Sequence, residues 1–543
     1  MTRPAIYTAL ALCFLSQASF AQRDTTRTQS VDITSAYKPV LRNAVKINFS
    51  GSHLPVDTSR PALRYNVPSQ NLFYAYQPVA LRPLALQMDS SMNLGDRRYV
   101  KAGFGTYSSP YLEAGFSFGD GRTSLLNLYG DYISAKGDIK HQDFSRLNVK
   151  ALGSYFVANH EIYGGVALEN HRYNLYGYDH NEHDYNKDDV KQNFEDLTFR
   201  VGVKNTSLNK LRINYDPSVE LNFFSLDGKA SESTVAFSVP ASRKFGEDFT
   251  FGAEFRGQFT NYRLLGDPSF RMNNNLIHLA PYLTWSKPMI TVHAGLKPTW
   301  NNGDVSLLPD IHFEAKLKDR VLMVQGGYQG RFVANTLNRL SSINPFLAPP
   351  AFINNTREVE FFGGIKASVG KHFSFSAKAG MINYENVPVF INDTATDNKA
   401  FIVTNETNLN NFRLQGDISY INQDKFTLNA ALTLNGYTGM EVHEHAWNMV
   451  PMEVRTSVRW WAFKQLMVKG DLYLFGGGDA LDKGNTTVPF DGGTDLSAGL
   501  EYRINKNFGA WLNFNNILND KYERWKNYEV YGMNVMGGIR VNF

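Results

Sequence analysis

Apolar residues alternate with polar or small residues along the last thirteen residues of the chain. The odd positions are Tyr531, Met533, Val535, Gly537, Ile539, Val541 and Phe543. The even positions are Gly532, Asn534, Met536, Gly538, Arg540 and Asn542. Because successive side chains of a strand point to opposite faces, this segment predicts a strand with one apolar and one polar face.

The same two-residue period recurs from about residue 97 to the end of the chain. It is clearest in residues 197–204, 249–259, 373–381 and 426–434. No helical pattern supplies a layer that could cover so many apolar faces, whereas lipid outside and water inside explain both faces of every strand. We therefore predict an all-β protein in which residues 97–543 form one transmembrane antiparallel β-barrel.

The connections between the predicted strands are of two alternating kinds. The tight connections are residues 119–121, 244–248, 286–288, 318–320, 370–372, 423–425 and 505–507. The longer connections are residues 135–143, 177–192, 264–274, 334–357, 383–410, 437–450, 475–488 and 515–529. Short periplasmic turns and long external loops are typical of outer-membrane barrels, and this pattern predicts about 22 strands, give or take about two.

The beginning of the chain predicts export. Arg3, the apolar run 5–15 and Ser19-Phe20-Ala21 form a signal peptide over residues 1–21, and the apolar run is too short to span a bilayer. The only cysteine, Cys13, lies inside it, so we expect a mature chain without a disulfide or a lipid anchor. An exported chain of this kind is predicted to lie in the outer membrane of a Gram-negative cell.

Residues 22–96 differ from the barrel because alternation is weak and prolines interrupt them. These prolines are Pro39, Pro55, Pro61, Pro68, Pro78 and Pro83. Proline removes ladder donors, so an extended, irregular segment is expected. It either enters the lumen or lies in the periplasm as a docking segment; a lumen enclosed by about 22 strands is a wide aqueous hole unless something fills it.

Composition and charge fit this picture and exclude one class of function. Aromatic residues make up 13% of the chain, and 43 glycines are present, which is high for a soluble protein. The net charge is only +4 and no basic tract is concentrated anywhere, so we expect no nucleic-acid partner.

Short motifs resemble the TonB-dependent receptor family of outer-membrane transporters. They are Asn516-Ile517-Leu518-Asn519-Asp520-Lys521-Tyr522, the terminal Gly538-Ile539-Arg540-Val541-Asn542-Phe543, and the loop from Leu340 to Leu347 leading to Glu358-Val359-Glu360-Phe361. In its overall style, including Val31-Asp32-Ile33-Thr34-Ser35-Ala36-Tyr37-Lys38-Pro39, the chain is similar to proteins of Bacteroidetes.

The resemblance implies a non-enzymatic barrel that binds or passes solutes across the outer membrane. That family carries a folded plug domain ahead of the barrel, whereas residues 22–96 are too short for one. Val31-Asp32-Ile33-Thr34 is a candidate for a TonB-contacting box. The alternative is a non-transporting barrel subunit of a larger secretion or assembly complex, with residues 22–96 as its docking segment. In either role, residues 22–96 are the expected contact for TonB or other envelope proteins. A rim hydrolase is a third reading, but no serine lies in a nucleophile elbow.

Two groups of histidines are candidates for metal ligation, although no cofactor is expected. His443 and His445 fall with Glu441 on one face of a predicted strand, and His180 and His183 lie in the acidic loop 177–192. Imidazole and carboxylate groups at these spacings can hold a divalent ion. A solvated polar loop is the alternative for both groups.

Charged residues on the polar faces are predicted to line the lumen. They are Arg200, Lys204, Glu254, Arg256, Glu360, Lys366, Lys378 and Arg540. Such groups can select which solutes pass, or they can pair across neighbouring strands and stiffen the wall.

The terminal strand is predicted to close the barrel. An open strand edge in lipid is not viable, so it should pair with the first strand near residues 99–107. By resemblance, Phe543, Val541 and Ile539 form the signal that the barrel-assembly machinery recognises, and lipid is the partner of their apolar face.

Overall fold

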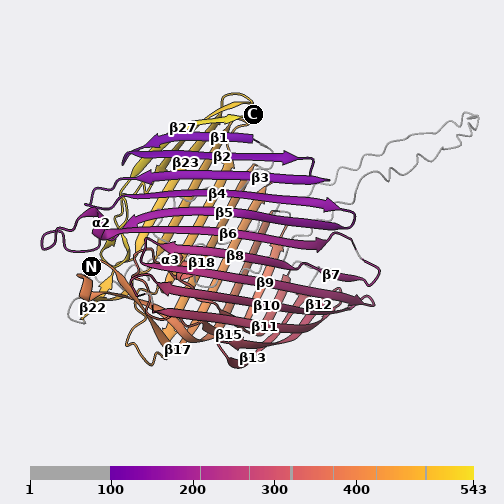
Figure 1. The fold of residues 1–543 in the computed structure, drawn as a ribbon. Coiled ribbons are helices and arrows are strands. Elements are labelled where there is room, and N and C mark those ends of the chain that lie inside the picture. Colours follow the sequence, from indigo (N-terminus) through magenta and orange to yellow (C-terminus); the bar gives the residue numbers. More distant parts are fainter. Residues whose placement is uncertain are drawn as a thin grey trace, which may run out of the picture. The chain divides into compact units, whose positions relative to one another are not determined.

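The computed structural model describes residues 98–543, apart from residues 208, 268, 318–321, 371, 423–424 and 483–485. The predicted signal peptide (1–21), the proline-rich segment (22–96) and residue 97 lie outside the described residues. Within the described part, antiparallel strands make up nearly the whole wall of the protein (Figure 1).

The elements are bounded as follows. The strands of the main sheet are β1 Arg98–Gly105, β2 Ser109–Gly119, β3 Ser124–Ala135, β4 Phe144–Val157, β5 His160–Asn174, β6 Lys191–Asn205, β7 Ile213–Tyr215, β8 Ser218–Leu226, β9 Ala230–Phe245, β10 Phe249–Leu264, β11 Arg271–Ser286, β12 Ile290–Asn301, β13 Asp304–Leu317, β14 Leu322–Val333, β15 Thr356–Val369, β16 Phe373–Asn392, β17 Phe401–Asn422, β18 Phe426–Thr438, β19 Met452–Trp461, β20 Leu466–Phe475, β23 Gly493–Arg503, β24 Phe508–Asn515 and β27 Asn534–Asn542. The connections carry β21 Gly478–Asp482, β22 Thr486–Phe490, β25 Glu523–Trp525, β26 Tyr528–Glu529, α2 Lys187–Val190, α3 Leu337–Ile343 and the short 3₁₀ turn η3 Thr394–Thr396.

The sheet closes on itself. β7 and β8 both pair with β9 and continue one another across Asp216-Pro217, so the 23 strands of the sheet form a wall of 22. β27 pairs with β1 through Val541↔Val100 and Gly537↔Phe104, which removes the last free edge. The predicted barrel of about 22 strands and its closure near residues 99–107 are confirmed.

Alternation sets which side of the wall each residue faces. On the outer side, Phe251 is 51% exposed, Val201 is 56% exposed and Ile539 is 57% exposed, as expected for side chains that contact lipid. Glu254 and Lys204 stand between such positions and therefore face the lumen. In the part of the chain that the structure describes, no helix is long and apolar enough to cross a membrane.

One predicted loop is largely a hairpin. The sequence pattern predicts an external loop over residues 383–410, but β16 runs to Asn392 and β17 begins at Phe401, with the two strands paired down to Asn392↔Phe401. The strands continue because pairing satisfies their backbone groups beyond the membrane, where the sequence signal for lipid contact has ended. Only residues 393–400 form the loop.

Candidate functional site: the lumen and its external closure

Long connections fill the external end of the barrel. We call residues 175–190, 334–355, 439–451, 476–482, 486–492 and 516–533, with the wall residues on which they pack, the external closure. Its largest buried cluster is Leu175, Tyr176, Tyr178, Val190, Phe194, Phe224, Leu226, Ala230, Tyr262, Leu337, Leu340, Ile343, Phe346, Leu347, Ile353, Phe390, Ala400, Phe401, Trp525 and Tyr528. These residues come from separate parts of the barrel's circumference, so together they bridge the end of the lumen.

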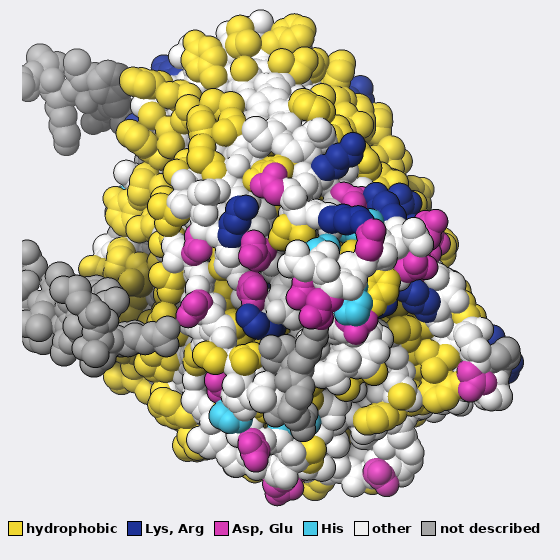
Figure 2. Space-filling model, turned by 90° about the vertical axis from the view of Figure 1, so that its left-hand side faces the viewer, with side chains coloured by type: hydrophobic (Ala, Val, Ile, Leu, Met, Phe, Trp, Pro, Cys, Tyr) yellow, Lys and Arg dark blue, Asp and Glu magenta, His cyan; other side chains and the backbone are white. Residues whose placement is uncertain are grey.

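Figure 2 shows the external end face-on. Lys, Arg, Asp, Glu and His side chains gather over its middle, and hydrophobic side chains surround them (Figure 2). A charged outer surface therefore covers the buried apolar cluster, while the apolar surround belongs to the wall that meets lipid.

The helix α3 lies at the centre of the external closure. Thr336 caps it by accepting a hydrogen bond from Arg339 N at 3.1 Å. The carboxylate of Glu232, from wall strand β9, accepts hydrogen bonds from Leu337 N at 2.5 Å and Asn338 N at 3.4 Å. Leu337 and Leu340 face the buried cluster, as their three-residue spacing allows. The wall thus holds the first turn of the helix by its otherwise unpaired N–H groups.

Buried asparagines fasten both ends of the loop that carries α3. Asn355 Nδ2 donates to Asn274 Oδ1 at 2.6 Å and to Asn301 Oδ1 at 2.7 Å. Asn274 Nδ2 donates back to Asn355 Oδ1 at 2.8 Å and to the carbonyl of Asn335 at 2.9 Å. Paired amides of this kind tie residues 335 and 355 to the wall strands β11 and β12 without leaving buried donors unmet.

Aromatic contacts join loops that start from different sides of the barrel. The rings of Phe346 and Tyr528 stack with centroids 3.7 Å apart, and Tyr176 meets Tyr528 edge-on at 4.8 Å. Trp525 contacts Phe401 at 5.4 Å between ring centroids. The loops 175–190, 334–355 and 516–533 therefore share one core rather than standing separately in solvent.

A small cavity lies beneath α3. Arg339, Glu358 and Arg413 contribute to its lining, and its volume is about 60 Å³. Such a volume suits a few water molecules, whereas pockets for drug-sized ligands measure roughly 300–1,000 Å³. In this closed arrangement the cavity is too small for a large solute.

The predicted group at Glu441, His443 and His445 lies in a loop and not on a strand, so its predicted common face does not form. Glu406 accepts hydrogen bonds from the backbone N–H groups of Glu441 at 2.8 Å and His443 at 2.9 Å, which holds the loop in place. His445 Nδ1 lies 2.9 Å from Asp479 Oδ2. Partial burial lowers the pKa of His443, so this ring is neutral at neutral pH.

The second predicted metal group, His180 and His183, lies in the external loop 175–190. His180 Nε2 is 3.1 Å from the carbonyl oxygen of Tyr176, and His183 Nε2 is 3.4 Å from Asp397 Oδ1. Tyr185 donates a hydrogen bond to Asp397, which raises the pKa of its phenol to about 12. The two histidines thus have separate partners, one within the loop and one on the neighbouring loop.

Most of the predicted luminal charges have partners on the wall. Cross-strand ion pairs and other contacts are Lys204–Glu161 at 3.0 Å, Lys378–Glu360 at 2.7 Å, Lys366–Glu314 at 2.9 Å, Ser238 Oγ–Glu254 at 2.9 Å and the Arg540 guanidinium over the Tyr99 ring at 4.6 Å. Arg200 and Arg256 are exposed on the same face. Opposite charges on neighbouring strands, as in Lys204–Glu161 and Lys378–Glu360, stabilise a sheet, and Lys366–Glu314 spans the intervening strand β14. These groups therefore both line the lumen and brace its wall.

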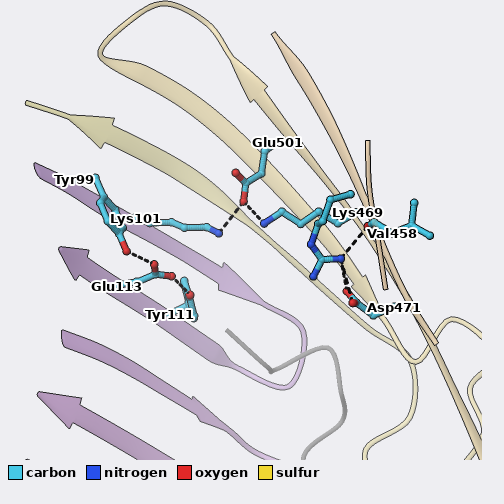
Figure 3. Close-up of polar contacts among 9 residues, drawn as sticks. Tyr99, Lys101, Tyr111, Glu113, Val458, Lys469, Asp471 and Glu501 are labelled. Atoms are coloured by element: carbon cyan, nitrogen blue, oxygen red, sulfur yellow. Dashed lines mark hydrogen bonds and ion pairs between the residues drawn. The ribbon is translucent and has the colours of Figure 1, made fainter. Parts of the chain in front are cut away.

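A network of luminal side chains crosses the closing seam (Figure 3). Glu501 Oε1 accepts from Lys101 Nζ at 3.1 Å and from Lys469 Nζ at 2.5 Å, which links β1 to β23 and β20 over the intervening β24 and β27. Tyr99 and Tyr111 both donate to the carboxylate of Glu113. The seam is therefore held by side chains as well as by the β1–β27 ladder.

The predicted assembly residues end the wall. Phe543 is 72% exposed, and its N–H donates to the carbonyl of Arg98 at 3.0 Å, so the last residue belongs to the β1–β27 ladder. Ile539 faces outward, and Val541 is half-buried between Val100 and Phe508. Recognition of these residues by assembly machinery stays a prediction.

One group of residues that the sequence pattern did not single out comes together on the luminal wall. His293 of β12 lies opposite His312 of β13, with Asp310 beside them. A signal for it exists in Asn302-Gly303, the dipeptide preferred in two-residue hairpin turns. Such a turn pairs residue 301 with 304 and, by counting back, residue 293 with 312. For the helix α3, by contrast, the local signal is weak: Thr336 is of a residue type preferred at helix N-caps, but a helix of 7 residues is too short to show a clear helical period.

Comparison with known proteins gives the fold. No family model and no curated protein sequence matches the chain. Among solved structures, the FrpB iron transporter from Neisseria meningitidis superposes with a TM-score of 0.64 at 9% identity, covering 82% of this chain and 81% of that one. A mutant of the ferric enterobactin receptor PfeA from Pseudomonas aeruginosa gives a TM-score of 0.60 at 10% identity, covering 82% and 80%.

The ferripyoverdine receptor of the outer membrane of Pseudomonas aeruginosa gives a TM-score of 0.60 at 11% identity, covering 82% of this chain and 72% of that one. At such low identity these likenesses show the fold alone. The barrel has the architecture of outer-membrane receptors, and a closed barrel with an apolar outer face indicates the Gram-negative outer membrane.

Proposed function

We propose that this chain is an outer-membrane barrel of the TonB-dependent receptor type, which binds a solute at the external closure and passes it through the lumen. The observation that supports this most is a 22-strand barrel whose charged lumen is closed externally by a folded set of loops. A barrel of this width without a closure would be a permanent aqueous hole.

Passage would require the loop that carries α3 to leave the lumen. Leu337, Leu340 and Phe346 are all buried in the external closure, and exposing each such side chain costs about 1.5–3 kcal/mol. The closed state therefore dominates without ligand. A solute must supply the difference by binding better to the open state than to the closed one.

The decisive experiment compares the conductance of two forms in planar bilayers. Wild-type protein should be silent or nearly so, and a variant with residues 337–349 replaced by a short glycine-serine linker should conduct as a wide pore. The control carries the same linker in place of residues 462–465, the connection between β19 and β20 at the opposite end. Equal conductance of all three forms would remove the external closure as the barrier.

A barrel subunit of a larger envelope complex is the second candidate. It is favoured by the pairing of luminal charges with one another, as in Lys378–Glu360 and Lys101–Glu501, which leaves these groups engaged within the wall. Its docking segment would be residues 22–96. Stoichiometric partners that co-purify with the wild-type protein and are lost when residues 22–96 are deleted, together with no solute uptake by cells, would favour this role over transport.

Coupling to TonB is a separate part of the proposal. Val31-Asp32-Ile33-Thr34 is the candidate contact, and it lies outside the described residues. Energised uptake that is lost on replacing these four residues with glycine, with the barrel still assembled, would support coupling. Uptake unchanged by the replacement would remove it.

A further inference from the structure

Two histidines and one aspartate lie together on the luminal face of the β12–β13 hairpin. The rings of His293 and His312 stack with centroids 4.4 Å apart and planes inclined by 15°. Asp310 Oδ2 is 3.4 Å from His293 Nε2, and Asp310 Oδ1 is 3.9 Å from His312 Nδ1. One ligand atom from each residue lies within 4.8 Å of the other two, and this is the only such group found among the described residues.

The orientation of His293 points to a ligand. Its Nδ1 lies 3.1 Å from Thr284 Oγ1 on the neighbouring strand β11, while its Nε2 is buried and makes no hydrogen bond. A histidine that binds metal through one ring nitrogen has the other nitrogen held by a hydrogen bond in the same way. The nearest acceptor to His293 Nε2 is Asp310 Oδ2 at 3.4 Å, which is too far for a well-formed hydrogen bond, and an ion bound between the two would satisfy both groups.

A glycine leaves space beside this nitrogen. Gly295 pairs directly with Asp310 in the sheet. A Cβ atom at this position would lie 3.4 Å from His293 Nε2 and 3.0 Å from Tyr282 Cβ. A side chain at this position would therefore press on the strand β11 and on the edge of the imidazole, and glycine leaves room beside His293 Nε2.

We propose that His293, His312 and Asp310 bind one divalent first-row transition-metal ion on the luminal wall. Two imidazoles and one carboxylate suit Zn²⁺, Co²⁺, Ni²⁺ or Cu²⁺, whereas Mg²⁺ and Ca²⁺ prefer oxygen ligands alone. Three protein ligands leave at least one coordination position for water or a solute in the lumen. The site does not depend on transport, because a barrel that passes no solute would bind the ion equally well.

Lys297 is the competitor of the metal. Its Nζ lies 3.0 Å from Asp310 Oδ2, so in the metal-free protein the ammonium neutralises the carboxylate. Gln329 Nε2 donates to Asp310 Oδ1 at 3.0 Å and lies 3.1 Å from His312 Nδ1. A metal ion must displace the Lys297 ammonium, and the flexible lysine stem allows this. Removing Lys297 should therefore tighten metal binding, which is the opposite of the effect of removing a ligand.

The test uses the full-length protein, purified in detergent without a polyhistidine tag and stripped with a chelator. Zn²⁺ binding is measured by calorimetry, and Co²⁺ binding by its visible absorption bands. Each of His293→Ala, His312→Ala and Asp310→Asn should weaken Zn²⁺ binding by more than the ~10–100-fold that losing an outer-shell partner costs. Lys297→Met should strengthen it. A shift in electrophoretic mobility on heating checks that every variant is folded.

Two control variants make the result specific to this hairpin. His278→Ala removes another histidine, on strand β11 of the wall, and should leave the affinity for Zn²⁺ unchanged. The double variant His180→Ala/His183→Ala removes the external-loop candidates and should also leave it unchanged. The proposal is overturned if wild-type protein binds no Zn²⁺, if the double variant abolishes binding, or if His293→Ala and His312→Ala bind as the wild type does. None of these outcomes alters the conductance experiment on the external closure.

Discussion

The two ends of the barrel share one wall but differ in the connections between its strands. At the external end, loops such as 334–355 and 516–533 bury a core of aromatic and aliphatic side chains. At the periplasmic end, connections such as 120–123 and 158–159 are tight turns. In the first of these, Asp120 accepts hydrogen bonds from three backbone N–H groups, which holds the pKa of its carboxyl well below the usual range.

Structural specificity is therefore concentrated at the external end of this protein. The wall is held by backbone ladders that any alternating sequence can form, and its luminal side chains pair locally or across the seam. The external closure depends on particular side chains that fit one another. We therefore expect core substitutions at the external end to be costly and to open the lumen, and substitutions at the periplasmic end to be milder.

The largest effect is expected from Phe401→Ala. Phe401 is 0% exposed and packs on Trp525, so its removal should lower the free energy of unfolding by about 3–5 kcal/mol and raise conductance. The matched control, Phe361→Ala, removes a phenylalanine that is 66% exposed toward lipid and should cost about 1–2 kcal/mol. Denaturant unfolding in lipid vesicles measures both. Equal losses of free energy of unfolding in the two variants would show that the external closure is no more sensitive to substitution than the wall.

The second-largest loss of stability is expected from Asn355→Ala. It removes the acceptor of the buried Asn335 backbone N–H and the paired amide of Asn274, which costs about 1–3 kcal/mol, and it loosens one end of the α3 loop. Asn273→Ala, at an exposed position of the same strand β11, should stay within about 0.5 kcal/mol. Proteolysis of intact cells checks whether the loop is released. Protection equal to that of the wild type would show that packing alone holds it.

Glu501→Gln tests the seam at the periplasmic half. It leaves the ammonium groups of Lys101 and Lys469 without their shared carboxylate, and luminal water reduces the cost to about 1–2 kcal/mol. Glu314→Gln, which breaks the more exposed pair with Lys366, should cost between 0 and about 1 kcal/mol. Unfolding at low and at high salt measures both losses in free energy of unfolding. If added salt screens the seam pair, the loss caused by Glu501→Gln should approach the loss caused by Glu314→Gln.

The smallest effect on stability is expected from Phe543→Ala, within about 0.5 kcal/mol, because the ring is exposed. Its amount in the outer membrane should nevertheless fall, since we predict that the assembly machinery recognises this end of the chain. Phe508→Ala, an exposed phenylalanine on the neighbouring strand β24, should assemble normally. Normal assembly of the Phe543 variant, measured by heat-modifiable protein in membranes, would contradict the signal role.

The wall of the barrel follows from the amino-acid sequence alone. A period of two residues assigns each side chain to lipid or lumen without reference to any other strand, and the turns between periods count the strands. Because β27 must pair with something, the same pattern names the segment near Tyr99 as its partner. The predicted faces of Phe251 and Glu254 need nothing more than their spacing.

What fills and lines the barrel depends instead on tertiary contacts. The helix α3 is held by Glu232, a residue more than a hundred positions earlier, and Lys101 reaches Glu501 across two intervening strands. Such contacts depend on the curvature of a closed wall and on loops that fold back into it. The pair His293 and His312 is intermediate between the features that local sequence determines and those that tertiary contacts determine. One correctly recognised turn fixes their pairing, because within a hairpin the register is local, whereas across a barrel it is not.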